Sequence, residues 1–428
     1  MKAAFYTLGC KVNQYETQSM REQLEENGID CTQNYGDADI VVINSCTVTS
    51  ESDRKTRQAV RRFRKNCPNA IIVLCGCVPA AFPNIKDDLP EADIIFSNAG
   101  DGKLPLLIKK YLETKERIID ISEHKKGEKY CTPSIKDFSE RTRAFVKIED
   151  GCDRFCSYCI IPTARGRVRS RSIDDVKAEV SALAKHGFCE VVLVGINLSA
   201  YGKGTEFNLC DAVSAIAEID GIKRIRLGSL EPDHITEEML NSLKAEDKFC
   251  PQFHLSLQSG CDATLKRMNR HYDAQFYRKL VKRIRKVFPD ASITTDIMVG
   301  FAGETDEDFE ASVQFAREIG FAKAHIFAYS RRKGTKADMY DNQVENAVKA
   351  KRSQIMIAEC KKCEDAFIES QLGRTFPVLF EQYENGYCEG YTENYTRVRA
   401  KADKDICGRI LNVKLLTREG ECCIGEII

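Results

Sequence analysis

The sequence lacks a long apolar segment. No stretch of its 428 residues approaches the ~18 consecutive apolar residues that a membrane-spanning helix needs. The first ten residues, MKAAFYTLGC, contain no apolar core of the kind found in signal peptides. We therefore expect a cytoplasmic protein without a membrane partner, in which the thiols stay reduced.

The chain also lacks net charge and is poor in histidine. Its 64 Lys and Arg residues balance 64 Asp and Glu residues, so a nucleic-acid surface would have to come from local clusters of basic side chains. The six histidines are scattered and show none of the paired Cys and His spacings of zinc sites.

Cysteine, in contrast, is abundant, with 20 residues. The tightest group lies in GCDRFCSYCIIP (residues 151–162), where Cys152, Cys156 and Cys159 have the spacing Cys-x-x-x-Cys-x-x-Cys. A four-iron cluster normally takes one thiolate per iron, so three thiolates would leave one iron free to bind a substrate or cofactor. A zinc site completed by a distant Cys or His, or a chance grouping, is the alternative.

The first hundred residues predict a parallel α/β sheet. Near-continuous apolar segments at residues 3–9, 38–46 and 70–77 alternate with helical patterns at residues 13–28 and 50–66. Such strands are typical of a sheet that helices cover on both faces.

A cysteine follows each of these three segments. Cys10, Cys46 and Cys77 lie at the C-terminal ends of the predicted strands, the edge at which open α/β sheets bind ligands. We therefore expect them to converge as a second metal site. Cys75 competes with Cys77 for the third ligand position, and three buried cysteines acting as small apolar residues are the alternative.

A second series of strand–helix units predicts a partial or full parallel barrel, with the cysteine triplet at its mouth. Its apolar segments are residues 143–151, 190–197, 224–230, 253–260, 292–301 and 323–330. The tail alternates apolar and polar residues between glycine turns, which predicts a small antiparallel β-barrel. The predicted divisions are an α/β domain (1–120), a linker (121–142), a barrel with a connecting helix (143–371) and the β-barrel (372–428).

With Tyr158 directly before Cys159, the triplet resembles the signature of radical S-adenosylmethionine (SAM) enzymes. Several other segments are similar to the methylthiotransferases of that group, and the tail is similar to their TRAM domain, an RNA-binding module. These segments are LGCKVNQYET (8–17), NSCTVT (44–49), GCV (76–78), HLSLQSGCDATLKRMNR (254–270), TDIMVGFAGETDEDF (295–309) and YSRRKGTKA (329–337). The form GCKVNQYET most resembles the subgroup that modifies N6-threonylcarbamoyladenosine in tRNA.

The resemblance implies two [4Fe–4S] clusters and two SAM molecules. Cys152, Cys156 and Cys159 would hold the catalytic cluster, at which SAM yields a radical that removes hydrogen from C2 of the adenine. Cys10, Cys46 and Cys77 would hold an auxiliary cluster that carries the sulfur. The substrate would be nucleotide 37 in the anticodon stem-loop of tRNA, and the reductant an electron donor such as flavodoxin or ferredoxin.

The resemblance also implies further contacts. Tyr158 would lie against the SAM adenine, and other strand-end residues would line the SAM pocket: Asn197, Ser229, Glu231, Gln258 and Gly300. In RGRVRSR, the alternating basic residues Arg165, Arg167, Arg169 and Arg171 are the predicted phosphate contacts. The alternative functions are methylthiolation of isopentenyladenosine tRNA or of a ribosomal protein, and a non-catalytic iron–sulfur protein that binds RNA.

Overall fold

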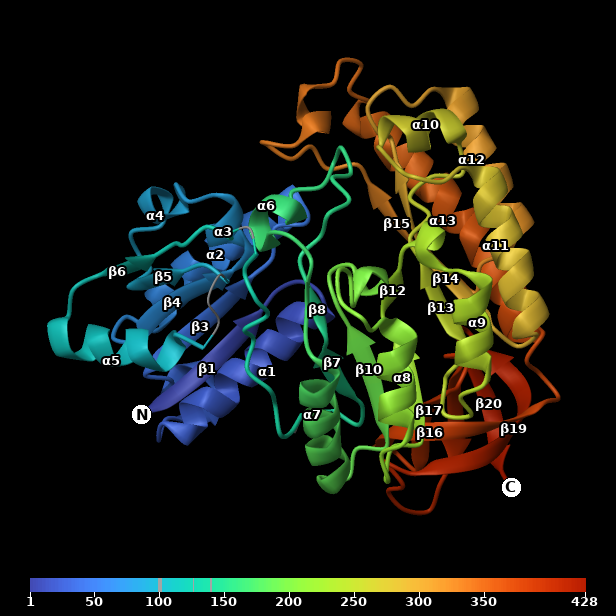
Figure 1. Ribbon diagram of the computed structural model, residues 1–428, viewed down its shortest axis with the longest axis horizontal. Helices are drawn as coiled ribbons and strands as arrows, with labels where there is room; N and C mark the ends of the chain where they lie inside the picture. Colours follow the sequence, from blue (N-terminus) through green and yellow to red (C-terminus); the bar gives the residue numbers. More distant parts are fainter. Residues whose placement is uncertain (99–101, 126, 139–140) are drawn as a thin grey trace.

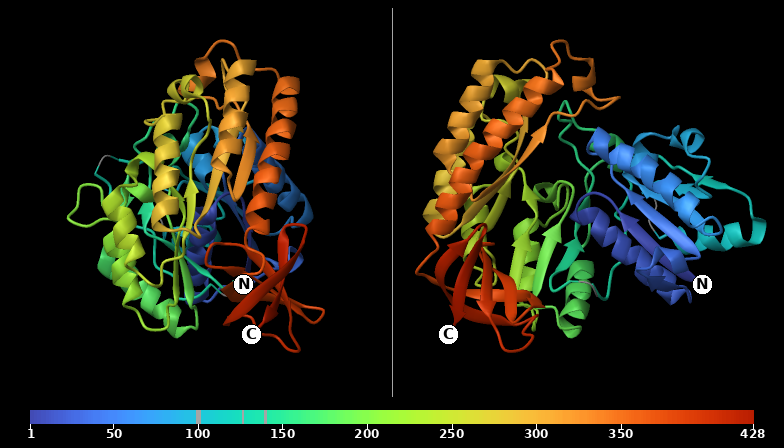
Figure 2. Two further views of the ribbon diagram at one scale, coloured as in Figure 1. Left: turned by 90° about the vertical axis from the view of Figure 1, so that its right-hand side faces the viewer. Right: turned by 180° about the vertical axis from the view of Figure 1, so that it is seen from behind.

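The computed structural model describes residues 1–98, 102–125, 127–138 and 141–428. An N-terminal α/β domain lies beside a central half-barrel, and a small β-barrel lies beneath the half-barrel (Figures 1 and 2). Residues 126 and 139–140 of the predicted linker and residues 99–101 lie outside the described part. Within the described ranges, no helix has the length and apolar character to cross a bilayer.

The N-terminal domain contains a six-stranded parallel sheet in the order β2-β1-β3-β4-β5-β6. Its strands are β1 (Lys2–Thr7), β2 (Asp30–Thr32), β3 (Ile40–Ser45), β4 (Ile71–Gly76), β5 (Ile94–Phe96) and β6 (Ile118–Asp120). The three predicted segments are β1, β3 and β4, so the predicted parallel sheet is confirmed. The other three strands have only three residues each, too few for a recognisable pattern.

Helices cover both faces of this sheet. On one face, α1 (Lys11–Glu26) and α5 (Leu104–Thr114) bury Leu24, Leu104 and Ile108 against the strands. On the other face, α2 (Ser50–Asn66) buries Val60 and Phe63. This two-sided burial is why the strands are apolar throughout rather than alternating.

The central domain is a half-open barrel of parallel strands in chain order. One sheet has the order β11-β10-β7 and the next β12-β13-β14-β15, and only Gly228 separates β11 from β12. The strands are β7 (Ala144–Lys147), β10 (Glu190–Val194), β11 (Arg224–Leu227), β12 (Ser229–Leu230), β13 (Gln252–Leu255), β14 (Ser292–Val299) and β15 (Lys323–Ala328). Helices outside the strands share one apolar core with them: α7 (Ile173–Lys185), α8 (Leu209–Ala217), α9 (Glu237–Lys244), α11 (Ala274–Val287) and α12 (Asp306–Ile319).

The C-terminal part begins with α13 (Asn346–Glu369), which packs against β15 and α12. A closed five-stranded barrel follows, in the order β16-β17-β18-β20-β19. Its strands are β16 (Thr375–Glu384), β17 (Tyr387–Thr392), β18 (Arg397–Lys401), β19 (Ile410–Glu419) and β20 (Cys422–Ile427). The partial parallel barrel and the terminal β-barrel are both confirmed.

Buried arginines join the two barrels. Arg224 donates hydrogen bonds to the backbone oxygens of Tyr391 (3.0 Å) and Pro377 (2.8 Å), and Arg226 donates to that of Glu393 (2.8 Å). The Glu190 carboxylate, whose side chain is 1% exposed, accepts from Arg226 at 3.0 Å and lies 3.5 Å from Arg224. The single negative charge of Glu190 thus partly offsets two guanidinium groups at the start of the half-barrel strands.

We therefore expect Glu190→Ala to lower the free energy of unfolding by about 3–5 kcal/mol, because it leaves buried arginines without their counter-charge. Urea unfolding measures the effect. The matched control is Glu218→Ala, since Glu218 pairs with Lys177 on the surface and its side chain is 73% exposed; that change should cost less than ~1 kcal/mol. Equal losses in both variants would contradict the role of Glu190.

Candidate active site

Cys10, Cys46 and Cys77 follow three adjacent parallel strands. Cys10 precedes α1, Cys46 comes directly after β3, and Cys77 opens the short helix α3 (Cys77–Ala81) after β4. Gly9 has a φ of +106°, and a Cβ added there would lie 2.7 Å from the Cβ of Cys46. The glycine therefore lets the Cys10 loop approach Cys46 closely. The prediction that the three cysteines share one sheet edge agrees with this arrangement.

Cys75 belongs to the core instead. Its thiol lies 3.9 Å from the Met20 sulfur, on the face of β4 that packs with Phe96 and Leu104. Cys77 packs with Ala81, Ile160 and Ala164. This placement favours Cys77 over Cys75 as the third ligand.

The second cysteine group lies in the loop after β8 (Glu149–Asp150). Gly151 has a φ of +89°, and a Cβ there would lie 2.0 Å from the backbone oxygen of Arg167, so only glycine fits. Ser157 fixes the middle of the loop, because its N–H donates to the Met268 oxygen at 3.0 Å and its hydroxyl to the Arg267 oxygen at 2.8 Å. The Cys159 N–H donates to the Cys156 oxygen at 3.0 Å, which curls the segment into a turn.

The two cysteine groups are neighbours in space. Helix α6 (Ile161–Arg165), which directly follows the triplet, packs against α3, which begins with Cys77. Ile160, next to Cys159, shares an apolar cluster with Cys77. A loop of the half-barrel also reaches the N-terminal domain, where Arg332 donates to the Thr47 hydroxyl at 2.6 Å, one residue after Cys46.

Arg165 connects the two domains through a buried network. Its side chain is fully buried and donates to the Glu16 carboxylate (2.5 and 2.9 Å), to Asn13 Oδ1 (3.1 Å) and to the Cys77 sulfur (3.3 Å). It also lies 3.3 Å from Asp150. Burial alone would raise the pKa of Glu16, but the positive charges of Arg165 and Lys147 hold that pKa below its usual range.

A second buried arginine contacts the triplet. Arg270 donates to the Cys156 sulfur at 3.2 Å, to the Glu231 carboxylate at 2.5 Å and to the Ser256 oxygen at 3.1 Å. Glu231, one of the predicted SAM-pocket residues, is thereby linked to a predicted cluster ligand. Sequence reasoning missed Arg270 and Asn13, although both lie in quoted segments, because nothing in a local pattern shows which sulfur a remote side chain reaches.

Without a bound metal, three of the thiols in these groups stay protonated. Burial raises the pKa of Cys77, Cys152 and Cys159 to about 12, and neighbouring thiols contribute to the increase. Neighbouring thiols in such surroundings become thiolates together only beside a strong positive charge, such as that of a bound metal. Across the described residues, no three His, Cys, Asp or Glu side chains are close enough to share one metal ion; the thiolates of a four-iron cluster bind separate irons.

The predicted SAM-pocket residues lie at strand ends of the half-barrel. Tyr158 packs against the apolar cluster that contains Phe301 and Tyr329. Asn197 is buried, and its side-chain oxygen has no hydrogen-bond partner within the described part of the chain. The Gln258 backbone pairs with Asp296 and Met298, and the Gly300 N–H donates to Glu304 at 2.9 Å. Their contact with SAM remains a prediction.

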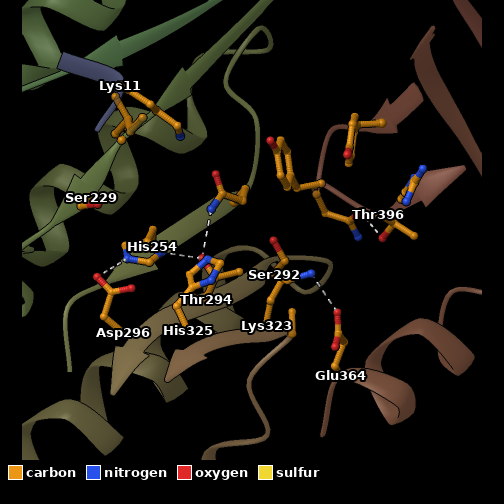
Figure 3. Close-up of a pocket in the computed structure, with 18 of the residues that line it drawn as sticks. Lys11, Ser229, His254, Ser292, Thr294, Asp296, Lys323, His325, Glu364 and Thr396 are labelled. Carbon is orange, nitrogen blue, oxygen red and sulfur yellow. Dashed lines mark hydrogen bonds and ion pairs between the residues drawn. The ribbon is translucent and has the colours of Figure 1, made fainter. Parts of the chain in front are cut away.

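A cavity of about 730 Å³ lies where the three domains meet. Cys10 and Lys11 line it from the N-terminal domain, and Tyr391 and Tyr395 line it from the C-terminal barrel. Strand residues of the half-barrel form its inner wall, including Ser229 and His254 (Figure 3). The cavity is large enough for a nucleoside and opens beside a predicted ligand of the auxiliary cluster.

The structure corrects the prediction of four phosphate-contacting arginines. Arg165, Arg169 and Arg171 are only 0%, 8% and 3% exposed and pair with internal carboxylates, so they do not face a surface that RNA could touch. Arg167 is exposed and lies over the ring of Phe155, 4.5 Å from its centroid. We keep only Arg167 as a predicted phosphate contact.

Comparison with known proteins agrees with this architecture. The model of the radical SAM superfamily matches residues 146–316, and that of an uncharacterised family, UPF0004, matches residues 2–97. The threonylcarbamoyladenosine tRNA methylthiotransferase MtaB of Bacillus subtilis is 35% identical over 96% of this chain and 93% of its own length. The tRNA-2-methylthio-N(6)-dimethylallyladenosine synthase of Caldicellulosiruptor saccharolyticus is 34% identical over 99% of this chain and 91% of its own length.

Among solved structures, the radical SAM methyltransferase TsrM from Kitasatospora setae, with cobalamin and a [4Fe–4S] cluster bound, has a TM-score of 0.58. The match covers 78% of this chain and 76% of the TsrM chain, at 14% sequence identity. At that identity the likeness concerns the fold alone.

Proposed function

This chain belongs to the radical SAM methylthiotransferases, and we propose that it converts N6-threonylcarbamoyladenosine at position 37 of tRNA to the 2-methylthio derivative. The observation that carries the proposal is the packing of α3 on α6, which brings Cys77 beside the segment that holds Cys152, Cys156 and Cys159. The relatives named for threonylcarbamoyladenosine and the form GCKVNQYET around Cys10 support the choice of substrate.

The cofactors, when bound, supply the radical that breaks the C–H bond of the adenine and the sulfur that replaces the hydrogen. In the proposal, Cys152, Cys156 and Cys159 hold the catalytic [4Fe–4S] cluster with SAM, and Cys10, Cys46 and Cys77 hold the auxiliary one. The reductant is an electron donor such as flavodoxin or ferredoxin, and the reaction takes place in the cytoplasm.

The protein's own side chains position the residues that would hold these groups. Arg270 donates to the Cys156 sulfur and the Glu231 carboxylate together, which fixes the cysteine relative to the predicted SAM pocket. Arg165 fixes the N-terminal domain against the half-barrel through Glu16. The cavity beside Cys10 gives the reacting base room between the three domains.

Nucleoside mass spectrometry tests the substrate. Total tRNA from cells that lack the gene should lose 2-methylthio-N6-threonylcarbamoyladenosine and keep its precursor, and expression of this chain should restore the product. Expression of the Cys156→Ala variant is the matched control and should not restore it. If deletion instead removes the methylthio derivative of isopentenyladenosine, as the dimethylallyladenosine relatives would suggest, the substrate assignment is wrong.

A further inference from the structure

Among the residues that the structure describes, one cation of the cavity has no carboxylate partner. Lys323 pairs with Glu364 at 3.3 Å and with Glu421 at 3.1 Å, and Arg397 pairs with Glu389. Lys11 is exposed, lines the cavity, and has no carboxylate within ion-pair distance in the described part of the chain.

The surroundings of Lys11 are positive as well. The guanidinium groups of Arg143 and Arg226 act on it electrostatically, and its ammonium lies 5.8 Å from the Phe145 ring centroid. Glu190 of β10 pairs with Arg226, and Glu381 of the C-terminal barrel pairs with Arg143. An anion that entered the cavity would therefore meet an uncompensated ammonium beside Cys10.

The facing wall of the cavity is polar rather than apolar. His254 has both ring nitrogens engaged, with the Thr294 hydroxyl at 3.0 Å and the Asp296 carboxylate at 3.3 Å. Gln252 donates to the same hydroxyl at 3.2 Å. The side chain of His325 lines this wall, and its ring centroid lies 6.1 Å from that of His254 (Figure 3). An apolar substituent would desolvate these groups without replacing their contacts with water, whereas a polar one can bond to them.

The chemistry of adenine connects these observations to the substrate. C2 and the exocyclic N6 lie on the same edge of the base, with only N1 and C6 between them, so a base that presents C2 to the Cys10 side holds its N6 substituent nearby. The threonylcarbamoyl group ends in a carboxylate and carries a hydroxyl and a urea. Resting on the function proposed above, we propose that Lys11 binds this carboxylate and selects an anionic N6 substituent against a neutral one.

Equilibrium binding of synthetic anticodon stem-loops tests Lys11 directly. One RNA carries N6-threonylcarbamoyladenosine, and the other carries its methyl ester, which lacks the negative charge and is larger by one methyl group. Lys11→Met should weaken binding of the acid about ten- to hundredfold, as expected for the loss of a charge-assisted hydrogen bond. Binding of the ester should stay within about twofold, and Lys11→Arg should keep most of the preference for the acid.

Lys323→Met is the matched control, because it removes a cation from the same cavity while Lys361 still pairs with Glu364 and Glu421 (3.1 and 3.2 Å). Its preference for the acid should match that of the wild type. Iron content and the unfolding midpoint, measured on every variant, establish that the cluster next to Lys11 and the fold are retained.

The outcomes separate the two proposals. If Lys11→Met weakens the binding of both RNAs equally, Lys11 contacts RNA phosphate and the inference is wrong. If the wild type modifies the acid but Lys11→Met leaves both affinities unchanged, the proposed function stands and the role of Lys11 does not. If the wild type modifies only an isopentenyladenosine stem-loop, the substrate assignment itself is wrong, regardless of the affinities measured for the Lys11 variants.

Discussion

Cys156→Ala should abolish cleavage of SAM while the protein remains folded. The serine beside it, not the Cys156 sulfur, fixes the loop, since Ser157 makes the hydrogen bonds to Arg267 and Met268. Without one of the three thiolates, we expect SAM cleavage to fall by at least about 10³-fold, a small part of the acceleration that enzymes provide. Iron content should fall from about eight to about four atoms per chain, because each four-iron cluster needs its thiolates.

Anaerobic reconstitution, addition of dithionite and chromatography of 5′-deoxyadenosine and methionine measure this effect. Cys210→Ala is the matched control, because Cys210 is half-buried on α8, away from both cysteine groups. In contrast to Cys156→Ala, Cys77→Ala should still cleave SAM, but it should lose methylthio insertion and half of the iron. Normal cleavage by Cys156→Ala would remove the catalytic assignment of the triplet.

The sheet edge could be predicted because it depends on chain order and periodicity alone. In a parallel sheet every strand ends at the same edge, so a cysteine after each of β1, β3 and β4 lies there whatever the details of packing. The same reasoning placed Cys152 at the mouth of the half-barrel. Cys77 is preferred to Cys75 from the sequence because Gly76 precedes it, as Gly9 precedes Cys10. The structure agrees with this preference, since β4 ends at Gly76: Cys75 stays in the strand and packs in the core, whereas Cys77 opens α3.

The surroundings of the cysteines could not be predicted from a local pattern. The four alternating arginines of RGRVRSR are predicted phosphate contacts, yet only Arg167 of the four is exposed. Arg165 is buried because its partners come from remote parts of the chain. Asp150 lies on β8 of the same domain, and Glu16 lies on α1 and pairs with Arg165 only once the two domains pack. One signal was available: Cys10, Asn13 and Glu16 recur at three-residue spacing, which places them on one helix face.

This network makes a second large effect predictable. Arg165→Met should lower the free energy of unfolding by about 3–5 kcal/mol, because it leaves Glu16 and Asp150 buried with one cation fewer. It also removes the hydrogen bond to the Cys77 sulfur, which should shift the reduction potential of the auxiliary cluster. Urea unfolding and redox titration followed by electron paramagnetic resonance measure the two effects separately. SAM cleavage at the Cys152 group should be less affected than methylthio insertion, since the arginine touches only the N-terminal group.

Two variants separate the contact with sulfur from the buried charge. Arg165→Lys keeps the positive charge, but a single ammonium cannot reach Glu16, Asn13 and Cys77 at once, as the guanidinium does. This variant should therefore recover part of the stability that Arg165→Met loses. The reduction potential of its auxiliary cluster should stay shifted. Arg167→Met removes a neighbouring exposed arginine and should change neither quantity. If Arg165→Met unfolds like the wild type and its auxiliary cluster keeps the same potential, the other contacts between the two domains are sufficient to hold them together. These include the packing of α3 on α6 and the hydrogen bond from Arg332 to Thr47. Arg165 would then have no part in positioning the cluster.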